Sequence, residues 1–175
     1  MFEFGTDSYS IQCAVGELPS LYNEIVARVS LHDDFGIRGI DGESVFIAVS
    51  RAGEDWPFLA LSLRCAIGSG FRPGAFLIPE TDILLVGAEE QLLAYDLKSI
   101  TRLWEDYTMC GFWCWRRHSD IVVMSAELEI AGYSLRGDRL WSRSVEPPWS
   151  YKVDGEGVRL DVMGKLSHFS LATGV

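Results

Sequence analysis

Hydrophobic and polar positions repeat about every 37 residues over the C-terminal 100 residues of the chain. The run Asp82–Leu97 holds an apolar segment, a short polar interruption and a second apolar segment, and its order returns 38 positions later in Asp120–Leu135. Val158–Leu171 is a third copy, with Phe169 in the place of a tyrosine. A period in this range indicates a supersecondary unit that buries a face against the next copy.

Each copy has the pattern of short strands separated by turn residues. Polar turn sequences such as Glu89-Glu90 and Arg136-Gly137-Asp138 lie between apolar runs of strand length. Strands joined by short turns form antiparallel meanders, and uninterrupted apolar runs suit strands that are covered on both faces. The predicted strands are Ile83–Val86, Leu92–Leu97, Ile121–Met124, Ile130–Leu135 and Val158–Val162.

Aromatic and leucine positions recur at matched offsets within the copies. Tyr95, Tyr133 and Phe169 are expected in equivalent places of successive sheets, two positions before Leu97, Leu135 and Leu171. Trp104 and Trp141 close the first two copies. Because these tryptophans recur with the repeat, we expect them to be buried packing residues.

These features resemble the blades of quinoprotein-like (PQQ-repeat) and WD-type β-propellers. The resemblance rests on Ala94-Tyr95-Asp96-Leu97 followed by Leu103-Trp104, and on Gly132-Tyr133-Ser134-Leu135 followed by Leu140-Trp141. Closed propellers have about four to eight blades, whereas residues 75–175 show three copies. The resemblance therefore implies an incomplete or open propeller. Because the quinone cofactor of true quinoproteins lies on the axis of a complete ring, no cofactor and no binding residue carries over.

The first 70 residues diverge from the repeat. Leu18, Leu21, Ile25 and Val29 are spaced as on one face of a helix with Pro19 near its start, although alternation from Ile25 to Leu31 also fits a strand. We predict one short helix here. The strand-like runs are Tyr9–Val15, Val45–Ser50 and Phe58–Leu63, the last about 36 residues before the Tyr95 segment, so that a fourth blade within residues 40–70 stays open. The whole chain, 1–175, is predicted as a single all-β domain.

Composition and charge restrict the classes of binding partner that the chain could have. The chain is 48% hydrophobic and 23% charged, as globular proteins are, and its net charge is −10. Residues 1–60 hold ten acids and three bases (3 − 10 = −7), which places most of the acidity in the N-terminal third. A nucleic-acid ligand requires a basic footprint, and the sequence has none. A positively charged protein partner is the natural complement.

The sequence also suggests a compartment. No apolar stretch approaches the roughly 18 residues of a membrane span, and the N-terminus lacks the features of a secretory signal. The scattered cysteines fit no disulfide framework; they are Cys13, Cys65, Cys110 and Cys114. We expect a cytoplasmic protein with reduced thiols and no membrane contact.

The densest group of chemically distinctive side chains is Cys110–His118. Metal coordination by Cys110, Cys114 and His118 is unfavourable, because four residues along a strand span about 13 Å; no metal is expected. Aromatic residues and arginine are enriched in interface hot spots. The candidate binding residues here are Trp113, Trp115, Arg116, Arg117 and His118. Strand alternation places Trp113 and Trp115 on one face and Phe112 with Cys114 on the other; the alternative is that both tryptophans are packing residues.

His32-Asp33-Asp34 is the only close grouping of histidine with carboxylates. Asp33 and Asp34 are candidate contacts for a basic partner, together with the nearby Asp41 and Glu43. The sequence contains no G-x-S-x-G, P-loop or complete G-x-G-x-x-G motif. No catalytic residue is therefore assigned.

The function that these observations favour is a non-enzymatic protein-interaction module. One alternative is a bacterial immunity protein that neutralises a basic toxin, and another is an enzyme with an unrecognised site. An open array of sheets leaves edges that must be covered, paired or dimerised. A homo-oligomer is one solution, and completion of the last blade by N-terminal strands is another.

Overall fold

The computed structural model describes residues 2–36 and 42–175. Contacts group them into two units, unit 1 (Met1–Phe71 with Leu97–Thr101) and unit 2 (Arg72–Asp96 with Arg102–Val175). Strands make up 58% of the residues and helix 4%. The predicted all-β class with one short helix is confirmed, and the unit boundary falls where the repeats were predicted to begin.

Unit 1 contains a five-stranded sheet in the order β1-β2-β4-β5-β3 and a single helix. Its elements are β1 (Phe2–Gly5), β2 (Tyr9–Gly16), α1 (Tyr22–Arg28), β3 (Leu31–Asp34), β4 (Glu43–Arg51) and β5 (Leu59–Cys65). β3 pairs with β5 in parallel, whereas the other pairs are antiparallel. The connection from β2 to β3, which contains α1, passes over β4 and β5 and places β3 at the edge of the sheet.

This topology overturns two sequence-based possibilities. The segment Phe58–Leu63 lies largely in β5, between β4 and the parallel β3, so the strands of residues 42–70 belong to a larger five-stranded sheet and do not form a separate meander. The N-terminal strands β1 and β2 pair in this same sheet and do not complete the last blade. Local apolar patterns predicted these strands correctly, but strand partners depend on the crossover.

The helix forms where apolar spacing predicted it. It begins at Tyr22, whose N–H donates to the Pro19 carbonyl at 2.9 Å. Its apolar side packs on one face of the sheet, where three of the four buried sheet residues are alanines. The helix side contributes Tyr22, Ile25, Val26 and Val29, and the sheet side contributes Ala14, Phe46, Ala48 and Ala60. Leu18 lies before the helix and is exposed.

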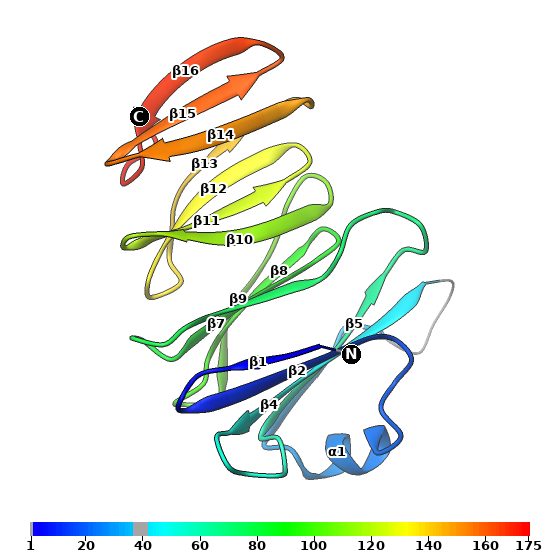
Figure 1. Cartoon of the computed structure of the whole chain (residues 1–175). Helices are drawn as coiled ribbons and strands as arrows, with labels where there is room; N and C mark the ends of the chain where they lie inside the picture. Colours follow the sequence, from blue (N-terminus) through cyan, green and yellow to red (C-terminus); the bar gives the residue numbers. More distant parts are fainter. Residues whose placement is uncertain (1, 37–41) are drawn as a thin grey trace. The chain divides into compact units, whose positions relative to one another are not determined.

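Unit 2 contains three successive antiparallel sheets (Figure 1). The first is β6 (Gly74–Ile78), β7 (Ile83–Ala88), β8 (Gln91–Asp96) and β9 (Thr101–Tyr107); the second is β10 (Phe112–His118), β11 (Ile121–Ala126), β12 (Glu129–Ser134) and β13 (Arg139–Ser144); the third is β14 (Trp149–Asp154), β15 (Gly157–Val162) and β16 (Lys165–Ser170). Within each sheet the strands follow chain order, as in a meander. The predicted strands of all three copies are confirmed.

The register confirms that the copies are structurally equivalent. Tyr95 pairs with Leu84, and the same pairing recurs as Tyr133 with Val122 and Phe169 with Val158. The three rings are 0%, 1% and 6% exposed, respectively. The repeated aromatic position therefore has one structural role, which is to fill the space around the third strand of each sheet.

Tryptophans on the fourth strands connect neighbouring sheets of unit 2. Trp104 stacks on Tyr133 with ring centroids 5.6 Å apart and donates from Nε1 to the Gly137 carbonyl at 2.7 Å. Trp141 meets Phe169 edge to face at 5.3 Å and donates to the Leu171 carbonyl at 2.7 Å. Trp141 is buried as predicted, and Trp104 is half-buried.

The third sheet differs from the first two in its outer face. Strands β7, β8, β11 and β12 are buried on both faces over nearly their whole length, whereas β14 alternates between half-buried and exposed residues. The half-buried residues of β14 pack toward the second sheet, together with the apolar residues Val158, Leu160 and Val162 of β15. On the other face, Lys152, Arg159 and His168 form one exposed cross-strand row. This polar face suits solvent contact, as in the terminal repeats of a stacked array.

Candidate protein-binding surface

Strand β10 carries most of the residues that the sequence proposed for binding, but they do not form one patch. A β-bulge lies between Phe112 and Cys114, so that Phe112 faces Ala126 and Trp115 faces Met124 on the same side of the sheet. Trp115 is buried beside Phe112, with ring centroids 5.5 Å apart. The prediction that Trp113 and Trp115 share a face is wrong, because the bulge inserts one residue into the alternation.

The remaining candidates on β10 lie toward its other end. Arg117 pairs with Glu80 at 2.7 Å and donates from Nε to the Ser119 carbonyl. His118 lies 3.3 Å from the Tyr151 hydroxyl, and burial lowers its pKa. Arg116 is exposed. Three to five strand residues, about 10–17 Å, therefore separate Trp113 from Arg116, Arg117 and His118.

The acidic candidates belong to the other unit. Asp33 and Asp34 lie on β3, and the Asp34 carboxylate accepts a hydrogen bond from the Gly36 N–H at 2.9 Å. Glu43 begins β4 and is exposed. Asp41 lies outside the described residues. The acidic candidates and the candidates on β10 therefore belong to different units.

Unit 2 gathers its inter-sheet linkers and one set of tight turns at one end, which we call the loop end. It comprises linkers 108–111 and 145–148 and the turns β7–β8, β11–β12 and β15–β16. The Thr108 N–H donates a hydrogen bond to the Glu90 carbonyl. At the equivalent place of the next linker, the Val145 N–H donates to the Leu128 carbonyl. The Glu127 N–H donates to the Gly111 carbonyl, and in the same way the Met163 N–H donates to the Pro148 carbonyl. This repeated hydrogen bonding fixes the linkers on the turns.

Large apolar side chains are exposed at the loop end. Tyr107, Met109, Trp113 and Met163 are 59%, 58%, 37% and 62% exposed, respectively. Trp113 stacks on the half-buried Trp149 with centroids 5.0 Å apart and planes 14° apart. Beside Trp149, an open depression of about 310 Å³ reaches Met163. Exposed apolar residues that cluster in this way mark interaction sites more often than isolated ones do.

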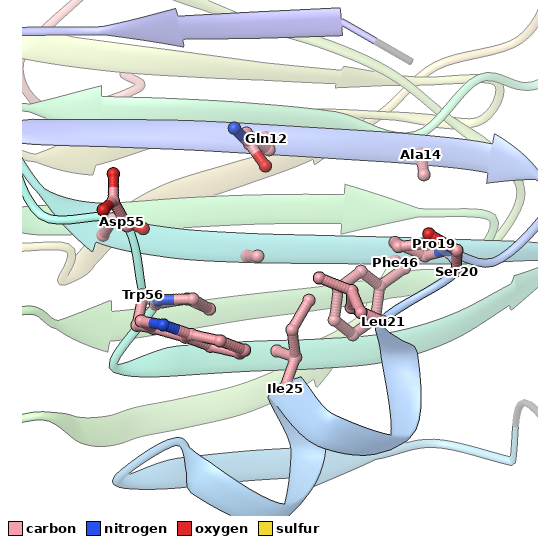
Figure 2. Close-up of a pocket in the computed structure, with 12 residues that line it drawn as sticks. Gln12, Ala14, Pro19, Ser20, Leu21, Ile25, Phe46, Asp55 and Trp56 are labelled. Carbon is pink, nitrogen blue, oxygen red and sulfur yellow. The ribbon is translucent and has the colours of Figure 1, made fainter.

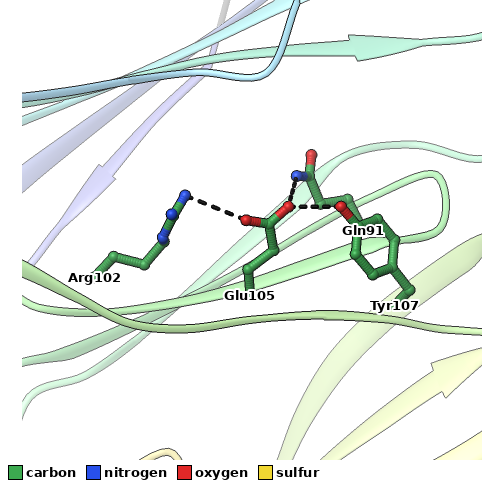
Figure 3. Close-up of polar contacts among 4 residues, drawn as sticks. All are labelled: Gln91, Arg102, Glu105 and Tyr107. Carbon is green, nitrogen blue, oxygen red and sulfur yellow. Dashed lines mark hydrogen bonds and ion pairs between the residues drawn. The ribbon is translucent and has the colours of Figure 1, made fainter.

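Glutamate side chains hold the two exposed aromatic rings in place. The Tyr107 hydroxyl donates to Glu105 at 2.6 Å, and the same carboxylate accepts from Gln91 at 3.0 Å and pairs with Arg102 at 3.4 Å (Figure 3). The Tyr107 hydrogen bond is the main reason why the pKa of Glu105 is lowered. Trp113 likewise donates from Nε1 to Glu127 at 3.2 Å.

The loop end is acidic as well as aromatic. Among the described residues it carries five glutamates that are exposed or half-buried, namely Glu89, Glu90, Glu105, Glu127 and Glu146. Its bases are Arg72, Lys165 and Arg102, and Arg102 pairs with Glu105. A further glutamate, Glu129, is buried beneath linker 108–111, and burial raises its pKa. An apolar centre with a negative rim is complementary to a partner with apolar and cationic side chains.

Sequence reasoning found Trp113 but missed Tyr107, Met109, Trp149 and Met163 as surface neighbours. Trp149 directly follows Pro147-Pro148, outside the predicted strands, and nothing in the spacing of Met109 and Met163 links them. The available signal was the repeat itself, because matched offsets place linkers 108–111 and 145–148 at the same end of their sheets.

The His32 group of unit 1 is arranged for packing. His32 Nε2 lies 2.9 Å from Ser62 Oγ, which in turn lies 3.1 Å from the Tyr22 hydroxyl. Although a serine beside a histidine is also a nucleophile–base geometry, Ser62 is 0% exposed. A substrate cannot reach this hydroxyl in the structure.

Two further properties concern the described residues only. They contain no group of three or more histidine, cysteine or acidic side chains arranged to hold a metal ion. Their helix is too short to cross a bilayer.

Comparisons with known proteins give partial structural likenesses. No family model and no curated protein matches the sequence. The computationally designed Ika4 protein aligns with a TM-score of 0.45 and 16% identity over 62% of this chain and 72% of its own. BamB from Moraxella catarrhalis aligns with a TM-score of 0.46 and 14% identity, over 78% of this chain and 45% of its own. Hsv2p from Kluyveromyces lactis aligns with a TM-score of 0.44 and 10% identity, over 78% of this chain and 42% of its own. BamB and Hsv2 are propellers, and this chain spans less than half of either. At these TM-scores the description of the fold rests on the chain's own repeated sheets, which are propeller-like in local topology and belong to no matched sequence family.

Proposed function

We propose that the chain is a non-enzymatic protein-interaction module that binds a basic segment of a protein partner at the loop end of unit 2. The observation that carries this proposal is the presence of two exposed aromatic rings, Tyr107 and Trp113, each held by a glutamate and neither closed into the core. Ordered aromatic side chains lose little conformational entropy on binding and are enriched in hot spots.

The charge of the loop end supports a basic partner. Two of its glutamates contact the exposed aromatic rings, and all of those at the surface are exposed or half-buried, so that they act mainly on the rate of association and on specificity. A complex formed in this way associates more slowly as salt rises, because the Debye length falls from about 10 Å at 0.1 M to about 3 Å at 1 M.

The test begins with recovery of a partner from the native host and continues with purified components. Trp113→Ala is expected to weaken the complex by about 30-fold, the size of a hot-spot loss. Leu140→Ala is the matched control, since Leu140 is also exposed and apolar but lies on β13, outside the loop end. Equal affinities of wild type, Trp113→Ala and Leu140→Ala contradict the proposed surface.

The same reagents address the narrower alternative, a protein that neutralises a basic toxin. If the recovered partner has an enzymatic activity, wild type should inhibit it at stoichiometric concentration and Trp113→Ala should not. Binding without inhibition supports the interaction module and removes the immunity alternative.

A further inference from the structure

Unit 1 contains a pocket of about 350 Å³ on the sheet face that α1 partly covers. Its floor consists of Ala14, Phe46 and Ala48, and α1 with the residues before it forms one wall. The other wall is the β4–β5 connection, with Trp56 and Pro57. All lining residues belong to unit 1, so the pocket is defined within that unit.

The sequence of this region explains why the pocket exists. The helix has only seven residues and so covers only part of the sheet face. Ala14 and Ala48 lie on neighbouring strands beneath the open part, where larger residues would fill the space. Leu21 at the mouth is 48% exposed, which is unusual for a leucine that adjoins the core.

The two ends of the pocket differ in polarity. Gln12 and Asp55 lie at one end, and Leu21, Pro19 and Phe46 lie toward the other (Figure 2). Phe46 and Ser50 are four residues apart on one strand, which corresponds to about 13 Å. The pocket thus accommodates an elongated apolar body with a polar group at one end.

Trp56 is held in its position on the wall. The Arg28 guanidinium from the last turn of α1 lies 3.7 Å from the centre of the Trp56 ring. This cation–π contact joins the β4–β5 connection to the helix and favours the position of Trp56 on the wall. Small-molecule sites are typically mostly apolar, largely preformed and equipped with a few polar groups, with volumes of about 300–1,000 Å³.

We propose that this pocket binds a small amphipathic amine, with its apolar body against Phe46, Leu21 and Ile25 and its ammonium group at Asp55. Asp55 is the one charged residue among those that line the pocket, and its carboxylate accepts hydrogen bonds without donating any. The side-chain carbonyl of Gln12 and the hydroxyl of Ser50 offer further acceptors. A cationic donor satisfies this end, whereas an anion is repelled by it.

The experiment uses three indole probes of similar size on the full-length protein. Tryptamine carries the amine, 3-ethylindole is its neutral counterpart, and indole-3-propionate is anionic. Binding is followed by two-dimensional NMR at the indole N–H of Trp56, assigned with Trp56→Phe. For a probe of this size we expect tryptamine to bind at about millimolar Kd or tighter. Its affinity should exceed that of 3-ethylindole by about three- to fivefold, the size of a partly exposed ion pair, with indole-3-propionate weakest.

Three variants separate the parts of the proposal. Asp55→Asn should reduce tryptamine to the affinity of the neutral probe, and its neighbour Glu54→Gln, an exposed acid outside the lining, should leave affinity unchanged. Leu21→Trp fills the pocket from its exposed mouth and should abolish the shifts of all three probes while the remaining spectrum stays native. Probes that shift Trp56 equally regardless of charge overturn the amine class. Shifts that persist in Leu21→Trp, or their absence in wild type, overturn the pocket as a binding site.

Discussion

At the scale of single residues, the tryptophans on the fourth strands show how one side chain joins two sheets. Trp141 lies across β12, where the missing side chain of Gly132 leaves room: a Cβ there would lie 2.3 Å from the Trp141 ring. Its ring then meets Phe169 of the third sheet, and its indole N–H satisfies the Leu171 carbonyl. Packing and hydrogen bonding thus depend on the same side chain.

Replacement of Trp141 should therefore be costly. We expect Trp141→Ala to lower the free energy of unfolding by about 3–5 kcal/mol, through lost burial and the cavity that remains. Trp141→Phe should recover part of this loss, because it keeps a ring but not the hydrogen bond. Urea unfolding measures both, with the neighbouring exposed Leu140→Ala as control, for which a change within about 0.5 kcal/mol is expected. A loss below about 1 kcal/mol for Trp141→Ala would show that the sheets do not depend on this contact.

Glu129 gives a pH-dependent prediction. Burial raises its pKa, a change that the positive charge of Arg139 and a hydrogen bond from Thr108 only partly oppose. The folded state therefore holds the proton more tightly than the unfolded state. The contribution of this group to stability is fully present below the unfolded pKa near 4.5 and is lost as pH rises through the higher folded pKa.

Glu129→Gln removes this titration. The free energy of unfolding of wild type minus that of Glu129→Gln should decrease as pH rises from 4 to 7, as measured by urea unfolding at several pH values. Glu127→Gln, two residues earlier and half-buried, is the comparison variant. A difference that stays constant or increases with pH contradicts the assignment.

At the scale of secondary structure elements, the bulge in β10 separates a packing residue from a surface residue. The ring of Trp115 lies 5.3 Å from that of Tyr133 in the core of unit 2, whereas Trp113 turns toward Trp149 at the loop end. The two tryptophans stand two positions apart and belong to different parts of the protein.

Substitutions of the two tryptophans in β10 should therefore differ in effect: one should mainly lower stability, and the other should mainly weaken partner binding. Trp115→Ala is expected to lower the free energy of unfolding by about 3–5 kcal/mol, and Trp113→Ala by about 1 kcal/mol or less, because a larger part of its ring already contacts solvent. Only Trp113→Ala should weaken partner binding under conditions where both variants are folded. Equal losses of stability would mean that Trp113 is also a core residue.

At the scale of the whole molecule, burial differs systematically between the sheets of unit 2. The central strands of the first two sheets are buried on both faces, and the third sheet presents a polar outer face. Most side chains of that face are polar and suit contact with water, although it also carries the exposed Leu166.

This gradient should appear in amide hydrogen exchange. The slowest amides of unit 2 are expected in β7, β8, β11 and β12, and faster exchange in β14 and β16, because strands with one solvated face open locally at lower free energy. Exchange measured by NMR or mass spectrometry checks this order. Protection of β16 equal to that of β11 would show that another surface covers the third sheet.

The sequence by itself determined the strands, their repeat and the equivalence of Tyr95, Tyr133 and Phe169, because apolar periodicity and turn residues are local properties that recur along the chain. It also located the single helix and Trp113 as a surface candidate.

The tertiary structure decided which residues meet. The parallel pairing of β3 with β5, the bulge that separates Trp113 from Trp115, and the stacking of Trp113 on Trp149 at the loop end all depend on contacts between distant segments. The pocket of unit 1 depends on them too, since its alanines and Trp56 line one space only after α1 has packed on the sheet. Periodicity predicts which side of a strand is apolar, but only packing determines what lies against it.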